Sequence, residues 1–282
     1  MPAAVRDLVP AFLDFWQQAA NASAERRLAL WRDYVARHPE VVHDVTRGGG
    51  EPDPTLALAR YRELVDRIKA NAPLATAWIE EAARLVAPVL QAQDLTVPCI
   101  SMVGMARSNG WVSEVDGRHT LFLAVEQIPD ADAARILATH EMAHAIQLPM
   151  PATPWPQDGP LGHGIFAEGF ATRLTVELLP EYGIAEHLWF GPGYDGWMAE
   201  CERRLPEARA EILACLDATD LGVQRRYLNL NGGHHLPDRI GYLIGVHAVE
   251  ELRQAYTWPE LARWGTDRAM AELRRVLAGA ET

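Results

Sequence analysis

The stretch Ile136-Leu-Ala-Thr-His140-Glu141-Met-Ala-His144-Ala-Ile-Gln147 places two histidines and a glutamate in an apolar run of good helix formers. Residues four apart lie on one face of a helix, so the imidazoles of His140 and His144 can reach the same metal ion. Zinc accepts neutral histidine nitrogen, and a catalytic zinc site leaves one position for water. Glu141 is placed to take a proton from that water and not to bind the metal. A buried helix with two hydrogen-bonded histidines is the alternative, but such polar groups rarely enter apolar helices without partners.

The sequence also indicates where this helix begins. Asp130 and Asp132 follow Pro129, where acidic residues favour the start of a helix. A helix over 131–147 is apolar on most faces, which predicts a central, buried position.

A third metal ligand is expected downstream of the two histidines. A Gly and a His at defined positions after His144 would extend the motif to the metzincin pattern, but Gln147 and Met150 occupy those positions. The stronger candidate is Glu168, which opens a second helical run ending near Pro180 and would complete a His₂Glu set.

Two observations bear on Glu168. Gly169 has no side chain, so this helix is expected to approach the histidine helix closely. A glutamate in a first helical turn is also favoured by the helix dipole alone, which is the alternative explanation. His163 and Asp158, on the intervening loop, are the other candidate ligands.

The motifs HEMAH and AEGFA together resemble those of gluzincin metallopeptidases. A closer resemblance is to an uncharacterised family of predicted zinc-dependent proteases, in which a glycine-containing β-region precedes HExxH and a P-x-x-x-G-Y-x-x-G helix follows E-G-x-A. The corresponding segments here contain Gly104, Gly110 and Pro237-Asp-Arg-Ile-Gly241-Tyr242-Leu-Ile-Gly245. The resemblance covers residues 95–255. Met142 departs from it, because the family commonly has an aromatic residue there.

This resemblance implies a zincin-like fold and peptide hydrolysis with one Zn²⁺ per chain. His140, His144 and Glu168 would hold the zinc, and Glu141 would act as general base. Tyr242 would support the oxyanion of the tetrahedral intermediate. His235 and Arg239 are weaker candidates for that last role.

Other functions stay open at this point. A structural zinc site would need a fourth protein ligand, such as His163 or His235. The chain could also be a zinc hydrolase of non-peptide amides, or a binding or regulatory protein on a peptidase scaffold. Neither the substrate nor the choice between endo- and exo-cleavage follows from the motifs.

Composition narrows the class of protein. The 282 residues are 49% hydrophobic and 23% charged, as in ordinary soluble proteins. A net charge of −12 argues against binding nucleic acid or anionic membranes. Cys99, Cys201 and Cys215 form no C-x-x-C motif and are expected to be reduced core residues. With neither a signal peptide nor a transmembrane run evident, we expect a cytoplasmic protein.

The predicted architecture is α+β and mostly α. Residues 1–94 are expected to form a helical segment packed on a catalytic domain over 95–282. A small antiparallel sheet or meander is predicted over 95–128, and a proline-rich loop over 149–163. Helices are predicted over 4–20, 24–37, 54–70, 73–92, much of 181–230 and 238–256.

Overall fold

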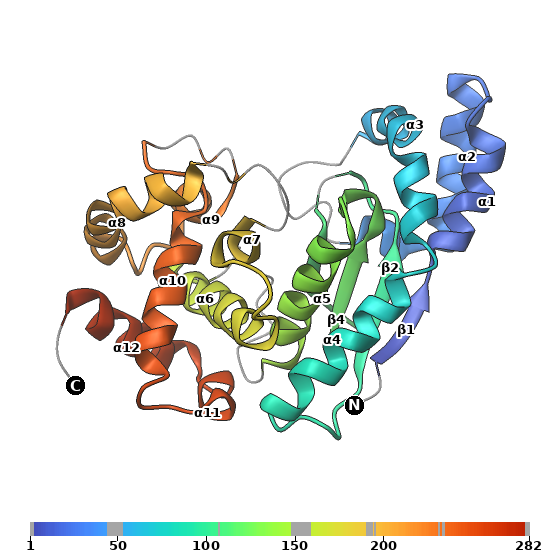
Figure 1. Ribbon diagram of the computed structural model, residues 1–282. Helices are drawn as coiled ribbons and strands as arrows, with labels where there is room; N and C mark the ends of the chain where they lie inside the picture. The colour runs from blue at the N-terminus through green and yellow to red at the C-terminus, as the bar shows by residue number, and fades with distance from the viewer. Residues whose placement is uncertain are drawn as a thin grey trace. The chain divides into compact units, whose positions relative to one another are not determined.

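A small mixed sheet lies within a mostly helical protein (Figure 1). In the computed structural model the strand order is β1-β2-β4-β3; β1, β2 and β4 are mutually parallel, and β3 pairs antiparallel with β4. The expected α+β class is confirmed, but the expected antiparallel sheet is wrong, because only the β3–β4 hairpin is antiparallel. The strands are β1 (Ala3–Asp7), β2 (Val97–Met102), β3 (Gly110–Val115) and β4 (Arg118–Ala124).

The structure describes residues 3–43, 53–106, 108–147, 159–189, 194, 196–230, 232 and 235–279. The chain divides into two compact units, and the dividing point falls within helix α5 (Ala131–Ile146). The first unit comprises Met1–Arg84 and Asp94–Glu141, and the second comprises Leu85–Gln93 and Met142–Thr282.

The first unit joins the sheet to the N-terminal helices and to most of α5. Segment 1–94, expected to be a helical support, supplies β1 to the sheet and so shares a unit with the other strands. Aromatic side chains form the core among the N-terminal helices, where Phe12, Tyr34 and Tyr61 are fully buried. The helices are α1 (Val9–Ala19), α2 (Ala24–Arg37), η1 (Pro39–Val42), α3 (Pro54–Asn71), η3 (Val125–Gln127) and the first part of α4 (Ala75–Val89), which continues into the second unit from Leu85.

The predicted helix over 4–20 is wrong in its first turn, where the chain is strand β1. Asp7 ends this strand; its Oδ1 accepts hydrogen bonds from Val9 N at 3.0 Å and from Ser101 Oγ at 2.7 Å. Parallel pairing with β2 decides the conformation here, and the local sequence does not reveal that distant partner.

The second unit consists of helices packed around α6 and α10. Helix α10 packs along α6, and α12 contacts both (Figure 1). The helix carrying Glu168 begins at Leu161, so this glutamate lies in mid-helix and not in a first turn as expected. The helices are α6 (Leu161–Leu178), α7 (Ile184–Trp189), α8 (Trp197–Ala214), α9 (Leu221–Leu228), α10 (Ile240–Leu252), α11 (Trp258–Ala262) and α12 (Thr266–Ala278).

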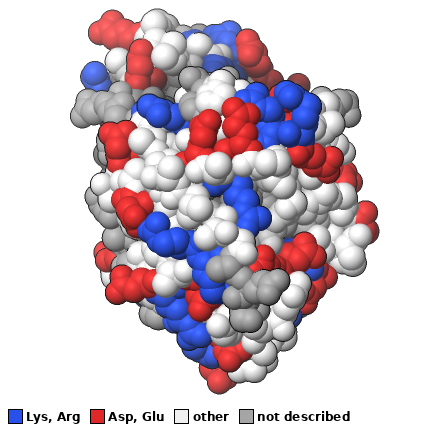
Figure 2. Space-filling model, turned by 90° about the vertical axis from the view of Figure 1, so that its left-hand side faces the viewer, with Lys and Arg blue, Asp and Glu red and all other residues white. Residues whose placement is uncertain are grey.

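The surface carries both signs of charge. Figure 2 shows acidic and basic side chains interspersed over one face of the molecule, so the net charge of −12 is not gathered into one patch there. Among the described helices, none combines the length and apolar character that crossing a membrane requires. Cys99, Cys201 and Cys215 are free thiols, and the first two are buried.

Candidate metal centre

Helix α5 carries both histidines of the motif, close to the predicted bounds. Asp130 begins the helix, and its Oδ1 accepts a hydrogen bond from Ala133 N at 2.8 Å. His140 and His144 follow one turn apart. The imidazole of His140 is 2% exposed, whereas that of His144 is partly exposed. The predicted helix is therefore confirmed, and its two imidazoles share one face.

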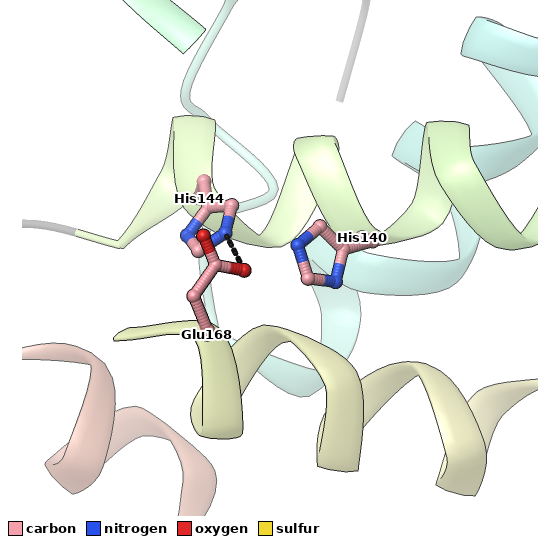
Figure 3. A group of neighbouring side chains, drawn as sticks. All are labelled: His140, His144 and Glu168. Carbon is pink, nitrogen blue, oxygen red and sulfur yellow. Dashed lines mark ion pairs between the residues drawn. The ribbon is translucent and has the colours of Figure 1, made fainter. Parts of the chain in front are cut away.

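Glu168 joins these histidines from α6, as predicted. Its side chain is 5% exposed, and Figure 3 shows the carboxylate directed at the two imidazoles. Glu168 Oε2 lies 3.5 Å from His144 Nε2. One ligand atom from each of His140, His144 and Glu168 lies within 4.8 Å of the other two. The structure thus brings together the three residues predicted to bind metal.

The spacing of these atoms suits a shared metal ion. Two ligand atoms that are each about 2.1 Å from a tetrahedral zinc lie about 3.4 Å apart. A charge-assisted hydrogen bond between imidazole and carboxylate would be shorter, about 2.7–2.9 Å. The observed 3.5 Å therefore matches two ligands of one ion better than a direct hydrogen bond. Two histidines and a glutamate are also a ligand set that leaves a fourth position open.

Glu141 lies beside the sheet in the first unit. Its side chain is 8% exposed and contacts the first residue of β3, Gly110. A Cβ atom on Gly110 would lie 3.0 Å from Glu141 Cγ and 3.2 Å from Leu137 Cδ1. The absence of a side chain at Gly110 therefore makes room for both side chains of α5.

Gly169 has a different neighbour from the one predicted. A Cβ atom on Gly169 would lie 2.2 Å from the carbonyl carbon of Gly245, and one on Gly245 would lie 2.2 Å from Ile165 O. These glycines allow α6 to approach α10, and not the histidine helix as expected. This contact fixes the backbone next to Glu168, so it holds the position of that side chain indirectly.

Tyr242 lies on α10, one turn before Gly245, and is half-buried. The guanidinium carbon of Arg239 lies 4.2 Å from the centre of the Tyr242 ring, a cation–π contact. Arg239 is 7% exposed and donates a hydrogen bond to Trp189 O at 3.4 Å. Arg239 therefore contacts the tyrosine ring directly and restricts its position. The expected catalytic role of Tyr242 stays a prediction.

His163 does not join the three-residue group in the part of the chain that the structure describes. It lies on α6, and its Nδ1 is 3.3 Å from Thr266 Oγ1. Burial and the neighbouring His144 lower the pKa of His163, which favours the neutral imidazole. Asp158, the other alternative ligand, lies outside the described residues.

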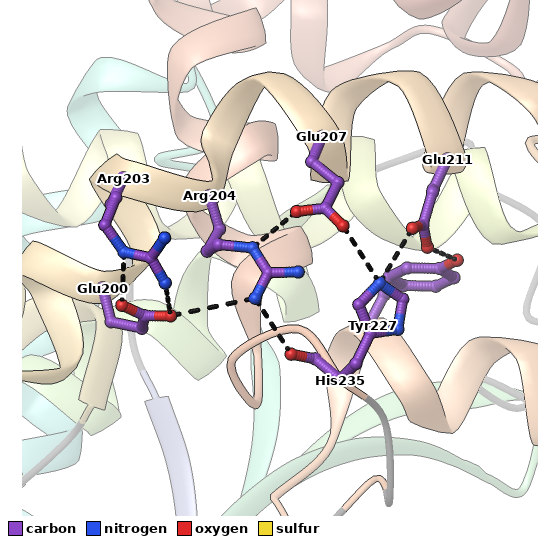
Figure 4. Close-up of polar contacts among 7 residues, drawn as sticks. All are labelled: Glu200, Arg203, Arg204, Glu207, Glu211, Tyr227 and His235. Atoms are coloured by element: carbon purple, nitrogen blue, oxygen red, sulfur yellow. Dashed lines mark hydrogen bonds and ion pairs between the residues drawn. The ribbon is translucent and has the colours of Figure 1, made fainter.

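His235 belongs to a separate polar cluster that the sequence did not reveal. Its Nε2 lies 3.2 Å from Glu207 Oε1 and 3.0 Å from Glu211 Oε1 (Figure 4). Arg204 is an additional partner of Glu207, with Nε to Oε2 at 2.5 Å. This cluster is largely exposed and is already balanced by a cation. In the sequence, the spacing of Glu207 and Glu211 indicates that both lie on one face of α8. The sequence gives no indication that His235 lies beside them.

Comparison of the chain with protein-family models, with curated proteins and with solved structures found no match.

Proposed function

We propose that this protein is a zinc-dependent metallopeptidase of the gluzincin type. The observation that carries the proposal is the convergence of His140, His144 and Glu168 within 4.8 Å, with Glu141 adjacent in the same helix. A zinc ion bound there would polarise a substrate carbonyl and lower the pKa of water toward about 7.

Glu141 is the residue proposed to move the proton. Its carboxylate follows a metal ligand directly and is largely withdrawn from solvent. It takes a proton from the attacking water and delivers it to the leaving amine. Tyr242 donates a hydrogen bond to the oxyanion in the proposed mechanism, and Arg239 restricts the ring that carries this hydroxyl.

Strand β3 lies at one edge of the sheet formed by the described residues, and this edge supports a peptide as substrate. Asn109 O accepts a hydrogen bond from Ala124 N of β4. Because the backbone N–H and C=O groups of successive residues point to opposite sides of an antiparallel strand, those of residues 110, 112 and 114 point away from β4, toward the edge. Ser108 Oγ binds Gly110 O at 3.0 Å, and His43 Nε2 binds Glu114 O at 3.1 Å. Among the described residues no side chain binds the backbone of Val112. An extended peptide can add to β3 there by backbone hydrogen bonds.

Metal content is the first test of the proposal. Wild type purified without added metal should contain about one zinc per chain, and Glu168→Ala should lose most of it, because two imidazoles alone hold zinc weakly. Glu202→Ala removes an exposed glutamate on α8 and should keep the zinc. Elemental analysis gives the answer without a known substrate.

Two results would count against the proposal. Zinc retained by Glu168→Ala would move the third ligand elsewhere. A folded wild type that binds no zinc after metal is added would exclude the metallopeptidase mechanism.

A further inference from the structure

In the short segment after β2, side chains from other elements bind the backbone of Gly104 and Ala106, the residues before and after Met105. Glu126 accepts hydrogen bonds from Gly104 N through Oε2 at 3.1 Å and from Ala106 N through Oε1 at 3.2 Å. Tyr61 Oη donates to Gly104 O at 2.5 Å, and Arg60 Nη1 donates to Ala106 O at 2.9 Å. The backbone N–H and C=O groups of Gly104 and Ala106 are therefore all bound by side chains. We call Arg60, Tyr61 and Glu126 the clamp.

The clamp holds the backbone in an unfavourable conformation. Ala106 has φ of +53°, a region that residues with a side chain seldom adopt. At Gly104 an added Cβ would lie 3.2 Å from Glu126 Oε1, so the backbone approaches the carboxylate closely. Such conformations persist only where the surroundings impose them, and they gather at functional sites.

Burying the carboxyl group of Glu126 costs free energy. It is fully buried, and burial raises the pKa of its carboxyl group to about 7, although the backbone N–H groups and Arg60 oppose the shift. Tyr34 and Tyr61 also interact with it electrostatically, and Arg67 Nη1 donates a hydrogen bond to its backbone carbonyl at 3.4 Å. An apolar side chain would fill this space without the cost of burying a charge. The carboxylate therefore specifies one conformation of the segment.

Helix α3 provides the base of the clamp. It carries Arg60 and Tyr61, and it also holds the turn that contains Glu126. Asn71 Nδ2 donates to Val125 O and to Ile128 O, both at 2.9 Å. The three clamp side chains thus share one support, and all lie in the first unit.

The clamped segment belongs to the connection that ends at β3. Gly110, the first residue of that strand, contacts Glu141, the proposed general base. Side chains of the connection also bind Gly110: Asn109 Oδ1 accepts from its N–H at 2.9 Å, and Ser108 Oγ donates to its carbonyl at 3.0 Å. A displacement of the connection would therefore move the strand away from Glu141.

We propose that the clamp of Arg60, Tyr61 and Glu126 positions β3 beside Glu141, with Glu126 as a positioning residue for the proposed reaction. The inference rests on the proposed function, because the position of β3 affects catalysis only if Glu141 is the general base. The coupling of the clamp to β3 is a property of the protein alone, so it can be measured without a substrate.

Hydrogen exchange at different pH values tests this coupling in the wild type. A buried carboxyl with a pKa of about 7, against 4.5 when exposed, stabilises the closed clamp most at low pH, and this stabilisation is lost as pH rises through 7. Protection factors of residues 108–111, which exclude Ser113 and Glu114 where His43 binds, should therefore be several-fold lower at pH 8 than at pH 6 after correction for intrinsic exchange. Strand β1 in the same unit should change much less. A uniform change across the unit, or no change in β3, would overturn the proposal.

Variants separate the clamp from general stability. Glu126→Gln should remove the pH dependence of β3 protection and lower kcat for peptide hydrolysis several-fold while zinc stays bound. Glu63→Gln, an exposed change on the same helix, should behave as wild type. If Glu126→Gln does not fold, Tyr61→Phe keeps the carboxylate and should lower β3 protection several-fold. An unchanged β3 in Tyr61→Phe would contradict the clamp, whereas a protein with the expected exchange but no hydrolysis would contradict only the proposed function.

Discussion

At the scale of single residues, the proposed chemistry depends on Glu141 lying close to the three candidate metal ligands without being one of them. Glu141 is largely buried, and its Cγ atom lies where a side chain at residue 110 would otherwise be. In the proposed mechanism this carboxylate only transfers protons, so the proposed site separates metal binding from acid–base chemistry.

Replacing Glu141 by Gln tests that separation. Glutamine keeps the size of the side chain but cannot accept the proton, so peptide hydrolysis should fall by roughly 10²–10⁴-fold. Zinc content should stay at about one per chain, because the three ligands are untouched. Activity would be measured on a peptide library with elemental analysis of the same samples. A variant with full activity would show that another group takes the proton.

At the scale of secondary structure elements, the approach of α6 to α10 holds Glu168, the proposed third ligand, in place. The two helices meet at Gly169 and Gly245, where backbone contacts backbone. Glu168 immediately precedes one of these glycines. A change in the distance between the helices therefore moves the backbone of a metal ligand.

The variant Gly169→Ala should separate these helices. Its Cβ would lie 2.2 Å from the carbonyl carbon of Gly245, and backbone cannot yield as a flexible side chain does. We expect a loss of about 1–3 kcal/mol in unfolding free energy and weaker zinc binding. Gly265→Ala is the matched control, because its added Cβ meets nothing within 4 Å. Urea unfolding and zinc titration would measure both effects; equal behaviour of the two variants would contradict the packing argument.

At the scale of the whole molecule, zinc should stabilise the folded chain by mass action. A ligand at 100 times its Kd that binds only the folded state adds about 2.7 kcal/mol. For a chain of 282 residues the thermal midpoint should rise by roughly 5 °C. Calorimetry with zinc and with a chelator would measure the difference. His144→Ala should show no such rise, and a rise of equal size in that variant would place the stabilising zinc at another site.

Local pattern was sufficient to predict much of this protein. The spacing of His140 and His144 predicted both the helix and the shared face, because helical periodicity is a local property. Glu168 lies beside these histidines, as expected, but in the middle of its helix and not in the first turn.

Only the tertiary structure decided the rest. Strand β1 and the parallel sheet depend on a partner far along the chain, which local propensity does not encode. The contact of Gly169 with Gly245 and the clamp at Glu126 likewise join distant segments. A sequence shows which residue types are present and how they repeat. Which backbone a glycine admits, or which N–H groups a buried carboxylate binds, depends on packing between elements.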